Sequence, residues 1–273
     1  MINKHSMGIR LLFFVLILLC SSRAYAQDME GPRVLALGGA FTAIADDSGA
    51  VRMNPAGIAL KKTYTLTLSS EKTKGGHDTI NATIIDSLTS ELAAGLSYTR
   101  EENGSTKRDF GILASAHSYK NFLAGLSVKY FSDKSTDEKD YSYDVGILLA
   151  PSKKLSMGLT GKNLEETKFA FVHKTYNAGL AYRPSSAFTA SFDFTKDLDV
   201  SGDDDIYAAG LEYAIKEGAI IRGGFTDHNI TDKTYYSVGF ALSAPQISLD
   251  YGFRWDKDDS DNNIQAFSIL VLL

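Results

Sequence analysis

Apolar and polar side chains alternate one by one over most of the chain. Between residues 187 and 196, for example, Phe188, Ala190, Phe192 and Phe194 are separated by threonine, serine and aspartate. Successive side chains of a β-strand point to opposite faces, so this pattern predicts strands with one apolar and one polar face. Such segments recur fourteen times, at 62–70, 79–86, 91–100, 108–118, 121–132, 141–150, 154–163, 174–183, 187–196, 205–215, 218–226, 233–243, 245–255 and 263–272.

The connections between the predicted strands alternate in length. Those after odd-numbered strands are longer and polar, as at 133–140 and 164–173, whereas those after even-numbered strands are short, as at 151–153 and 216–217. An even number of strands with long connections at one end and tight turns at the other is typical of an outer-membrane β-barrel. We therefore predict an all-β fold, a 14-stranded antiparallel transmembrane β-barrel over residues 62–273.

A soluble β-sandwich is the alternative, because its strands also alternate. Nothing in a sandwich, however, makes odd and even connections differ in length. Rings also lie near the ends of many predicted strands, as expected where aromatic side chains meet the lipid–water boundary. These rings are Tyr98, Tyr130, Tyr141, Tyr143, Tyr182, Tyr207, Tyr213, Tyr236 and Trp255. They favour the membrane barrel.

The first 26 residues have the features of an export signal. Lys4 and Arg10 precede an uncharged run at 11–20, and Ala24 and Ala26 place small residues before Gln27. This order is typical of a signal peptide. We predict cleavage after Ala26 and localisation in the outer membrane of a Gram-negative-type bacterium.

Composition excludes several kinds of site. The net charge of −5 argues against a nucleic-acid partner, which would require a basic face. The single cysteine, Cys20, leaves with the predicted signal peptide, so neither a disulfide nor a thiolate metal site is expected. The histidines have no metal-ligand spacing and no catalytic group of side chains is indicated. We expect no enzyme, no metal and no cofactor.

Residues 27–61 lack the alternation and precede the first predicted strand. The stretch 36–45 is rich in small apolar residues and predicts a short helix, with a stop at 46–49 and a turn at 54–57. Fourteen strands enclose a lumen too wide for wall side chains alone to fill, so we expect this segment to plug it. A repeated Ala-Gly-Leu motif places Gly95, Gly125, Gly179 and Gly210 on the polar face. These glycines either leave room inside the barrel or relieve strand curvature.

Two motifs in this segment carry a family resemblance. Residues 36–47, Ala-Leu-Gly-Gly-Ala-Phe-Thr-Ala-Ile-Ala-Asp-Asp, and 54–59, Asn-Pro-Ala-Gly-Ile-Ala, resemble the amino-terminal plug signature of FadL-like outer-membrane proteins. That superfamily includes the fatty acid transporter FadL and the PorV/PorQ proteins of type IX secretion. The resemblance implies a barrel with an N-terminal hatch and, in the FadL branch, hydrophobic compounds that leave sideways through a gap in the wall. The expected hatch residues are Gly38, Gly39, Phe41, Asp46, Asp47, Asn54, Pro55 and Gly57.

The polar face of the predicted strands should line the lumen. By the alternation, its charged and amide side chains are Asp144, Lys162, Asn177, Arg183, Asp193, Glu212, Arg222, Asp250 and Arg254. Their mixed signs predict cross-strand pairs and hatch contacts rather than a filter for ions of one sign. We hypothesise that Arg222 and Arg254 pair with inward acids or with the two aspartates at 46–47.

The long connections bear on the ligand. Phe169, Phe171 and Val172 form an apolar patch that either receives a hydrophobic ligand or folds onto the barrel rim. None of the long connections is net basic, so an anionic lipid would be repelled rather than steered. In the length and charge of these loops the chain departs from the FadL branch and is more similar to PorV/PorQ or other small members of the superfamily.

The expected function is passage or carriage of a hydrophobic small molecule across the outer membrane. The alternative is a PorV/PorQ-like structural or protein-secretion partner barrel with no small-molecule transport. The expected partners are accordingly membrane lipid and either a hydrophobic small-molecule ligand or secretion-system proteins.

Overall fold

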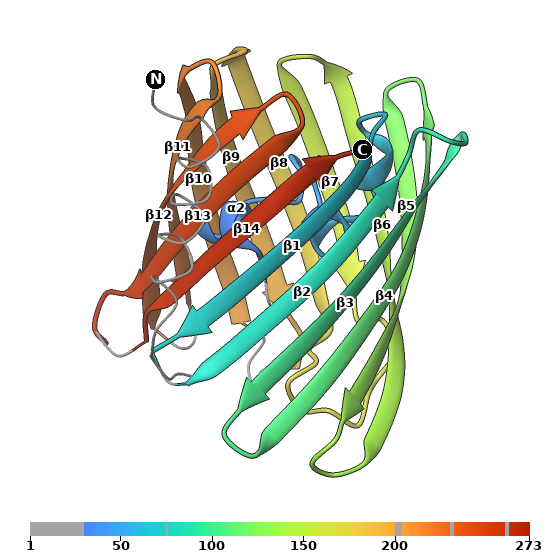
Figure 1. The fold of residues 1–273 in the computed structure, drawn as a ribbon, viewed down its shortest axis with the longest axis vertical. Helices are drawn as coiled ribbons and strands as arrows, with labels where there is room; N and C mark the ends of the chain where they lie inside the picture. Colours follow the sequence, from blue (N-terminus) through green and yellow to red (C-terminus); the bar gives the residue numbers. More distant parts are fainter. Residues whose placement is uncertain (1–29, 75, 200–203, 230–231, 260–261) are drawn as a thin grey trace, which may run out of the picture.

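The structure is a computed structural model that describes residues 30–74, 76–199, 204–229, 232–259 and 262–273. The predicted signal peptide lies outside the described residues. Fourteen antiparallel strands form a closed barrel in which β14 pairs with β1 (Figure 1). The predicted fold class is therefore confirmed. The strands are β1 Tyr64–Thr73, β2 His77–Asp86, β3 Leu92–Asn103, β4 Thr106–Tyr119, β5 Phe122–Asp133, β6 Glu138–Ser152, β7 Leu155–Lys162, β8 Thr175–Ser185, β9 Phe188–Asp197, β10 Asp204–Lys216, β11 Ala219–His228, β12 Lys233–Ala244, β13 Ile247–Asp256 and β14 Ile264–Leu272.

The apolar face of each strand points away from the barrel axis. On β3, Leu96 is 56% exposed, whereas its polar neighbours Ser97 and Thr99 are 3% and 1% exposed. The same order recurs around the barrel, with large apolar side chains exposed and serines, threonines and charged groups buried. A continuous apolar outer surface of this extent is typical of a protein surrounded by lipid and not of a soluble sandwich.

Two of the predicted long connections are in fact short. β1 and β2 are joined by residues 74–76, and β3 and β4 by residues 104–105, because their ladders continue to Thr73↔His77 and Asn103↔Thr106. The strands extend past the apolar band with polar residues on both faces, and there the alternation no longer marks a strand. The longest connection is 163–174, between β7 and β8.

The segment before the barrel folds into three short helices, α2 Pro32–Ala36, α3 Ala50–Met53 and the 3₁₀ helix η1 Pro55–Ala59. The predicted helix at 36–45 is wrong. α2 ends at Ala36, the first residue of that stretch, because Gly38 and Gly39 have φ values of +64° and +83°, in the left-handed region that glycine tolerates and that terminates a helix. The predicted turn at 54–57 is the start of η1, where the Asn54 side chain accepts a hydrogen bond from the Ala56 N–H.

Residues 30–61, called the N-terminal segment below, lie inside the barrel (Figure 1). α2 packs on β11 to β14, α3 on β3 and β4, and η1 on β3 to β6. Phe41 and Ile44 are fully buried among apolar wall residues such as Leu148. Within the described ranges, no helix is long and apolar enough to cross a membrane. The chain's own N-terminal residues thus pack against the inner wall of the barrel.

Candidate functional site

Glycines on the inner wall form a belt against which the N-terminal segment packs. The belt comprises Gly95, Gly125, Gly146, Gly158, Gly179, Gly210, Gly224, Gly239 and Gly252. Eight of these stand opposite one another on neighbouring strands, as Gly125↔Gly146, Gly158↔Gly179, Gly210↔Gly224 and Gly239↔Gly252.

Backbone of the N-terminal segment occupies the space that side chains would fill at the belt. A Cβ atom at Gly210 would lie 2.7 Å from the Leu37 carbonyl oxygen, and one at Gly179 would lie 2.9 Å from the Ala43 amide nitrogen. Real Cβ atoms do not approach other atoms so closely, so a larger residue at either position would require the segment or the wall to shift. The inward glycines were predicted either to leave room inside the barrel or to relieve strand curvature. These contacts are those of glycines that leave room for the segment.

Wall side chains also bond the segment's backbone directly. The carboxylate of Asp193 on β9 accepts hydrogen bonds from the N–H groups of Phe41, at 2.9 Å, and Thr42, at 2.7 Å. The hydroxyl of Ser156 donates to the Ala43 carbonyl at 2.7 Å, and that of Thr226 donates to the Gly38 carbonyl at 2.6 Å. The irregular backbone at 38–43 therefore has its polar groups satisfied by the barrel, as a buried loop requires.

Two arginines join the segment to the wall through acids. Arg33 of α2 pairs with Glu212 of β10 at 2.9 Å and with Asp47 at 2.9 Å, and it also bonds Asp46. Arg222 of β11 pairs with the same Glu212 at 2.7 Å and with Asp250 at 2.6 Å. The two arginines thus share one carboxylate across the interface.

Charge pairing within this network shifts the pKa of the segment's own groups. Burial alone would lower the pKa of Arg33, but the carboxylates of Asp46, Glu212 and Asp47 hold it well above the ordinary value. Burial alone would raise the pKa of Asp46, but Arg33 and Lys61 hold it well below the ordinary value. Arg33 and Asp46 therefore both remain charged inside the barrel.

Neither arginine pairs with the aspartates at 46–47, and both pair with other acids inside the barrel. Arg222 pairs with inward acids, whereas Arg254 faces Glu30 at 3.8 Å and lies over the Tyr235 ring. The aspartates at 46–47 bond instead to Arg33, which sequence reasoning missed. The sequence does not indicate which way the Arg33 side chain points, because residues around Gly31-Pro32 have no alternation from which a face could be assigned.

The other predicted lumen residues fall into separate local contacts. Asp144 is fully buried and pairs with Lys129 at 2.8 Å, which the prediction omitted. Asn177 bonds the hydroxyls of Thr160 and Thr195. Arg183 donates to Ser156 at 2.9 Å, and Lys162 is the last residue of β7. These residues line the same lumen but do not form one cluster.

The predicted hatch residues lie at the contacts that shape the segment. Pro55 lies against the wall at Gly125 and Gly146, and Asn54 donates to the carbonyls of Thr42, at 2.8 Å, and Ile147, at 3.2 Å. A Cβ at Gly57 would overlap the Ala45 backbone, so this glycine lets the segment pack on itself. The Arg33 guanidinium lies over the Phe41 ring, 5.3 Å from its centre. The segment is therefore compact as well as tied to the wall.

The apolar residues of the 163–174 loop pack onto the barrel instead of standing exposed. Phe169 is 5% exposed and contacts Phe131 of β5, while Phe171 contacts Phe110 of β4. These four rings and Val172, called the aromatic cluster below, lie at the end of the barrel that carries the 163–174 loop. We call this end the loop end, and the opposite end, where β1 begins, the turn end. The patch at Phe169, Phe171 and Val172 was predicted either to receive a ligand or to fold onto the barrel rim. The contacts are those of a loop folded onto the rim.

A histidine fastens the same loop. His173 Nδ1 lies 2.6 Å from the Asp197 carboxylate at the end of β9, and Asn163 donates to the His173 carbonyl at 2.7 Å. Partial burial works against protonation, but the bond to Asp197 prevails and raises the pKa of His173 above its ordinary value. The loop is therefore held by a contact that depends on the charge of one imidazole.

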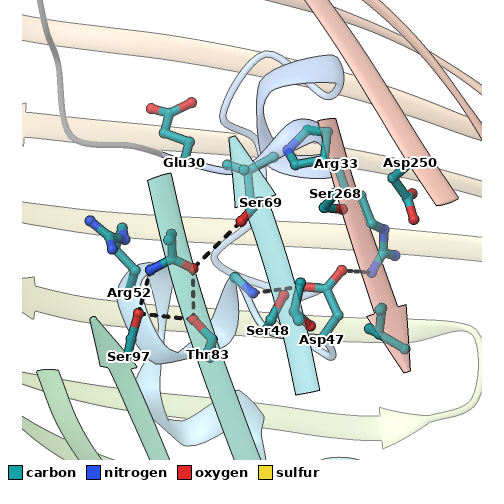
Figure 2. A pocket seen from close by; sticks show the side chains of 17 residues that line it. Glu30, Arg33, Asp47, Ser48, Arg52, Ser69, Thr83, Ser97, Asp250 and Ser268 are labelled. Carbon is teal, nitrogen blue, oxygen red and sulfur yellow. Dashed lines mark hydrogen bonds and ion pairs between the residues drawn. The ribbon is translucent and has the colours of Figure 1, made fainter. Parts of the chain in front are cut away.

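Cavities lie between the N-terminal segment and the wall. The inner cavity, of about 50 Å³, is lined by Arg33, Asp47 and Arg52 of the segment and by Ser69, Thr83, Ser97, Asp250 and Ser268 of the wall (Figure 2). The rim cavity, of about 280 Å³, lies at the turn end between Lys61, Thr63 and Ile247. Across the described ranges, no group of three or more His, Cys, Asp or Glu side chains is placed to hold a metal ion.

Comparison with known proteins gives structural likeness without sequence likeness. No family model and no curated protein sequence matches the chain. Among solved structures, the monoaromatic hydrocarbon channel CymD superposes with a TM-score of 0.70 at 12% identity, covering 92% of this chain and 99% of that one. The Ralstonia pickettii toluene transporter TbuX gives 0.67 at 11% identity, covering 90% and 98%. A Pseudomonas aeruginosa FadL homologue gives 0.63 at 11% identity, covering 93% and 99%.

These likenesses establish the fold. The chain has the barrel fold of the hydrocarbon channel CymD and of the FadL homologue, as predicted from the alternation of its strands. At about one residue in ten identical, the likeness does not itself identify a ligand.

Proposed function

We propose that the protein is an outer-membrane channel for small, uncharged hydrophobic molecules. The observation that carries the proposal is the aromatic cluster, which gathers apolar side chains from β4, β5 and the 163–174 loop at the loop end. Long connections of such barrels face the cell exterior. In the closed loop these rings are buried, so an apolar molecule would exchange water for ring contacts when the 163–174 loop opens. The fold shared with proteins described as a hydrocarbon channel and a toluene transporter supports the same assignment.

Charges around the aromatic cluster favour a neutral ligand over a fatty acid anion. The Arg108 guanidinium lies 4.0 Å from the centre of the Phe171 ring, but it already pairs with Asp133 at 3.0 Å. Glu101 and Asp197 are further acids at this end of the barrel. A carboxylate ligand would therefore meet more negative charge than free positive charge.

We propose that the N-terminal segment is the plug of this channel. The glycine belt and the Arg33 network hold it across the lumen, so a ligand passes only if the segment or the wall moves. The sideways exit implied by the family resemblance would need an opening in the wall. β14, β1, β2 and β3 are paired without a register shift, so an exit there would have to separate a complete ladder.

Uptake of labelled toluene tests the proposal. Bacteria lacking their own FadL-type proteins would express the wild type, Phe131→Ala or Tyr130→Ala, which changes the adjacent lipid-facing ring on the same strand. We expect the wild type and Tyr130→Ala to accelerate toluene uptake, Phe131→Ala to do so less, and palmitate uptake to remain at background.

Equal toluene uptake with and without the protein would refute the proposal. If the purified barrel instead retained secretion-system proteins and its lumen stayed sealed to toluene, the alternative of a secretion-partner barrel would replace it.

A further inference from the structure

Four neighbouring strands, β14, β1, β2 and β3, share an apolar hollow of about 330 Å³ on the outer surface of the barrel. The strands lie side by side at the front of Figure 1. Two small side chains, Ser70 of β1 and Ala82 of β2, lie diagonally across their strand pair. The larger side chains that line the hollow with them are Leu68, Ile80, Tyr98, Phe267 and Ile269. We call this hollow the outer groove. Because this face of a membrane barrel meets lipid, hydrocarbon chains are what would fill it.

A charged cluster borders the outer groove on the side of the loop end. Tyr98 belongs to both, because its ring lines the groove and its hydroxyl donates to the Asp109 carboxylate at 2.7 Å. Arg100 stands opposite Ile80 of the groove in the ladder of β2 and β3, and it donates to Asp109 at 2.8 Å. Lys134, which follows β5, pairs with the same carboxylate at 2.5 Å. The groove and the charged cluster therefore form one continuous surface.

Positive charge exceeds negative charge in this cluster. Asp109 faces two cations and can neutralise only one of them. Both cations remain accessible, since 39% of the Arg100 side chain and 51% of the Lys134 side chain is exposed. Together they carry more N–H donors than one carboxylate can accept. Two further lysines on this outer face each have a carboxylate of their own, Lys72 with Asp78 and Lys107 with Glu102. The cluster can therefore receive one more anion.

We propose that the outer groove and its charged cluster bind lipid A, the phosphorylated and multiply acylated glycolipid of the outer leaflet, with an acyl chain in the groove and a phosphate on Arg100 and Lys134. Long connections of such barrels face the cell exterior, so the cluster lies at the level of the outer-leaflet head groups. Tyr98 has the apolar ring and polar tip that are typical of this level. Clusters of Lys and Arg beside apolar surface bind anionic lipid head groups. This binding goes beyond the proposed transport and does not depend on it.

A second outer hollow provides the matched control. It has a volume of about 430 Å³ on β6 to β9 and is lined by apolar side chains such as Leu159, Ala178 and Phe194. Lys196 lies at its edge, as Lys134 does at the edge of the charged cluster, but Lys196 pairs with Asp205 at 3.0 Å without sharing that carboxylate with an arginine. We therefore expect this hollow to accept lipid chains without preference for a phosphorylated head group.

Native mass spectrometry of the full-length barrel in a mild detergent, titrated with lipid A, tests the site. Lys134→Gln and the double variant Arg100→Gln/Lys134→Gln remove positive charge from the cluster, and Ser70→Trp fills the groove. Lys196→Gln and Ala178→Trp make the same kinds of change at the second hollow. Lipid A without its phosphates and phosphatidylglycerol are the comparison lipids. Mobility of unboiled protein on gels would establish that each variant forms the barrel.

We expect the wild type to bind lipid A roughly tenfold more tightly than either comparison lipid, as charge-assisted hydrogen bonds to a phosphate would give. Lys134→Gln should weaken lipid A binding several-fold, and the double variant should reduce it to the level of the phosphate-free lipid. Ser70→Trp should weaken binding of lipid A with and without phosphates. Lys196→Gln and Ala178→Trp should bind lipid A as the wild type does.

Three results would overturn the proposal. They are unchanged lipid A binding in the double variant or in folded Ser70→Trp, equal weakening by Lys134→Gln and Lys196→Gln, and binding of phosphatidylglycerol as tight as that of lipid A. The last two would leave only general contact with lipid. If Ser70→Trp does not fold, the charge variants decide alone. Toluene uptake plays no part in these outcomes, so failure here leaves the proposed function standing.

Discussion

Arg33 and Glu212 lie 179 positions apart in the sequence and form an ion pair of 2.9 Å that fastens the N-terminal segment to β10. Glu212 also pairs with Arg222, and Arg33 also pairs with Asp46 and Asp47. The pair is therefore the link through which the charges of the segment and those of the wall form one network.

Replacement of Arg33 by leucine should release the segment from the wall. Three acids would lose their shared cation, and removing one partner of a buried pair costs about 3–5 kcal/mol. We expect a lower unfolding temperature, measured by gel mobility after stepwise heating, and faster proteolysis within residues 30–61. Arg100→Leu is the matched control, because its pair with Asp109 lies at the rim, where Arg100 is 39% exposed and such pairs contribute about 0–1 kcal/mol. Equal losses in both variants would mean that the network does not hold the segment.

Adjacent glycines of β11 provide a test of the belt. A Cβ at Gly224 would overlap the backbone of Leu37 and Gly38, whereas one at Gly223, on the outer face, meets nothing closer than 4.0 Å. Gly224→Ala should destabilise the barrel by about 1–3 kcal/mol through overpacking. Gly223→Ala should be neutral or slightly stabilising, because alanine loses less backbone entropy than glycine. The same heating series measures both, and a stable Gly224→Ala variant with an unmoved segment would contradict the packing.

Asp193→Asn should loosen the backbone at 41–42 without changing the shape of the side chain. The carboxylate accepts two N–H bonds there, and hydrogen bonds to a charged acceptor are roughly twice as strong as neutral ones. We expect a loss of about 1–2 kcal/mol and faster amide exchange at Phe41 and Thr42. Asp227→Asn is the control, because this carboxylate bonds the Thr234 hydroxyl and not the segment. Unchanged exchange at 41–42 would show that Asp193 does not anchor it.

The 163–174 loop should open as the pH rises. The pKa of His173 is raised in the folded state by Asp197, so the protonated imidazole stabilises the closed loop. That stabilisation is fully present below the unfolded-state value of about 6.5 and is lost as the pH rises through the folded-state value. Limited proteolysis of the loop should therefore be slower at pH 6 than at pH 9, and His173→Gln should remove the difference. A pH dependence that persists in His173→Gln would assign it to another group.

The barrel could be predicted from the sequence, but the arrangement of its plug could not. Strand faces follow from a period of two, so the sequence alone places Arg222 and Asp250 on the inner wall. The strand ends were misplaced where both faces become polar, as at 71–73 and 101–103.

The N-terminal segment has no period of apolar positions, and its conformation depends on contacts with strands far along the chain, from β3 to β14. Gly38 and Gly39 were recognised as part of a motif, yet their left-handed backbone ends the helix that local propensity favoured. The role of Arg33 required knowing that Glu212 lies opposite, which only the closed barrel determines.

Hydrogen–deuterium exchange of residues 30–61 in the barrel, reconstituted in lipid nanodiscs, tests the central claim that this segment fills the lumen. We predict exchange at Phe41, Thr42 and Ala56 as slow as in the strands that surround them, because their N–H groups bond Asp193 and Asn54 inside the wall. Exchange of the whole segment within seconds, beside protected strands, would show that the lumen is not filled by it and would contradict the account.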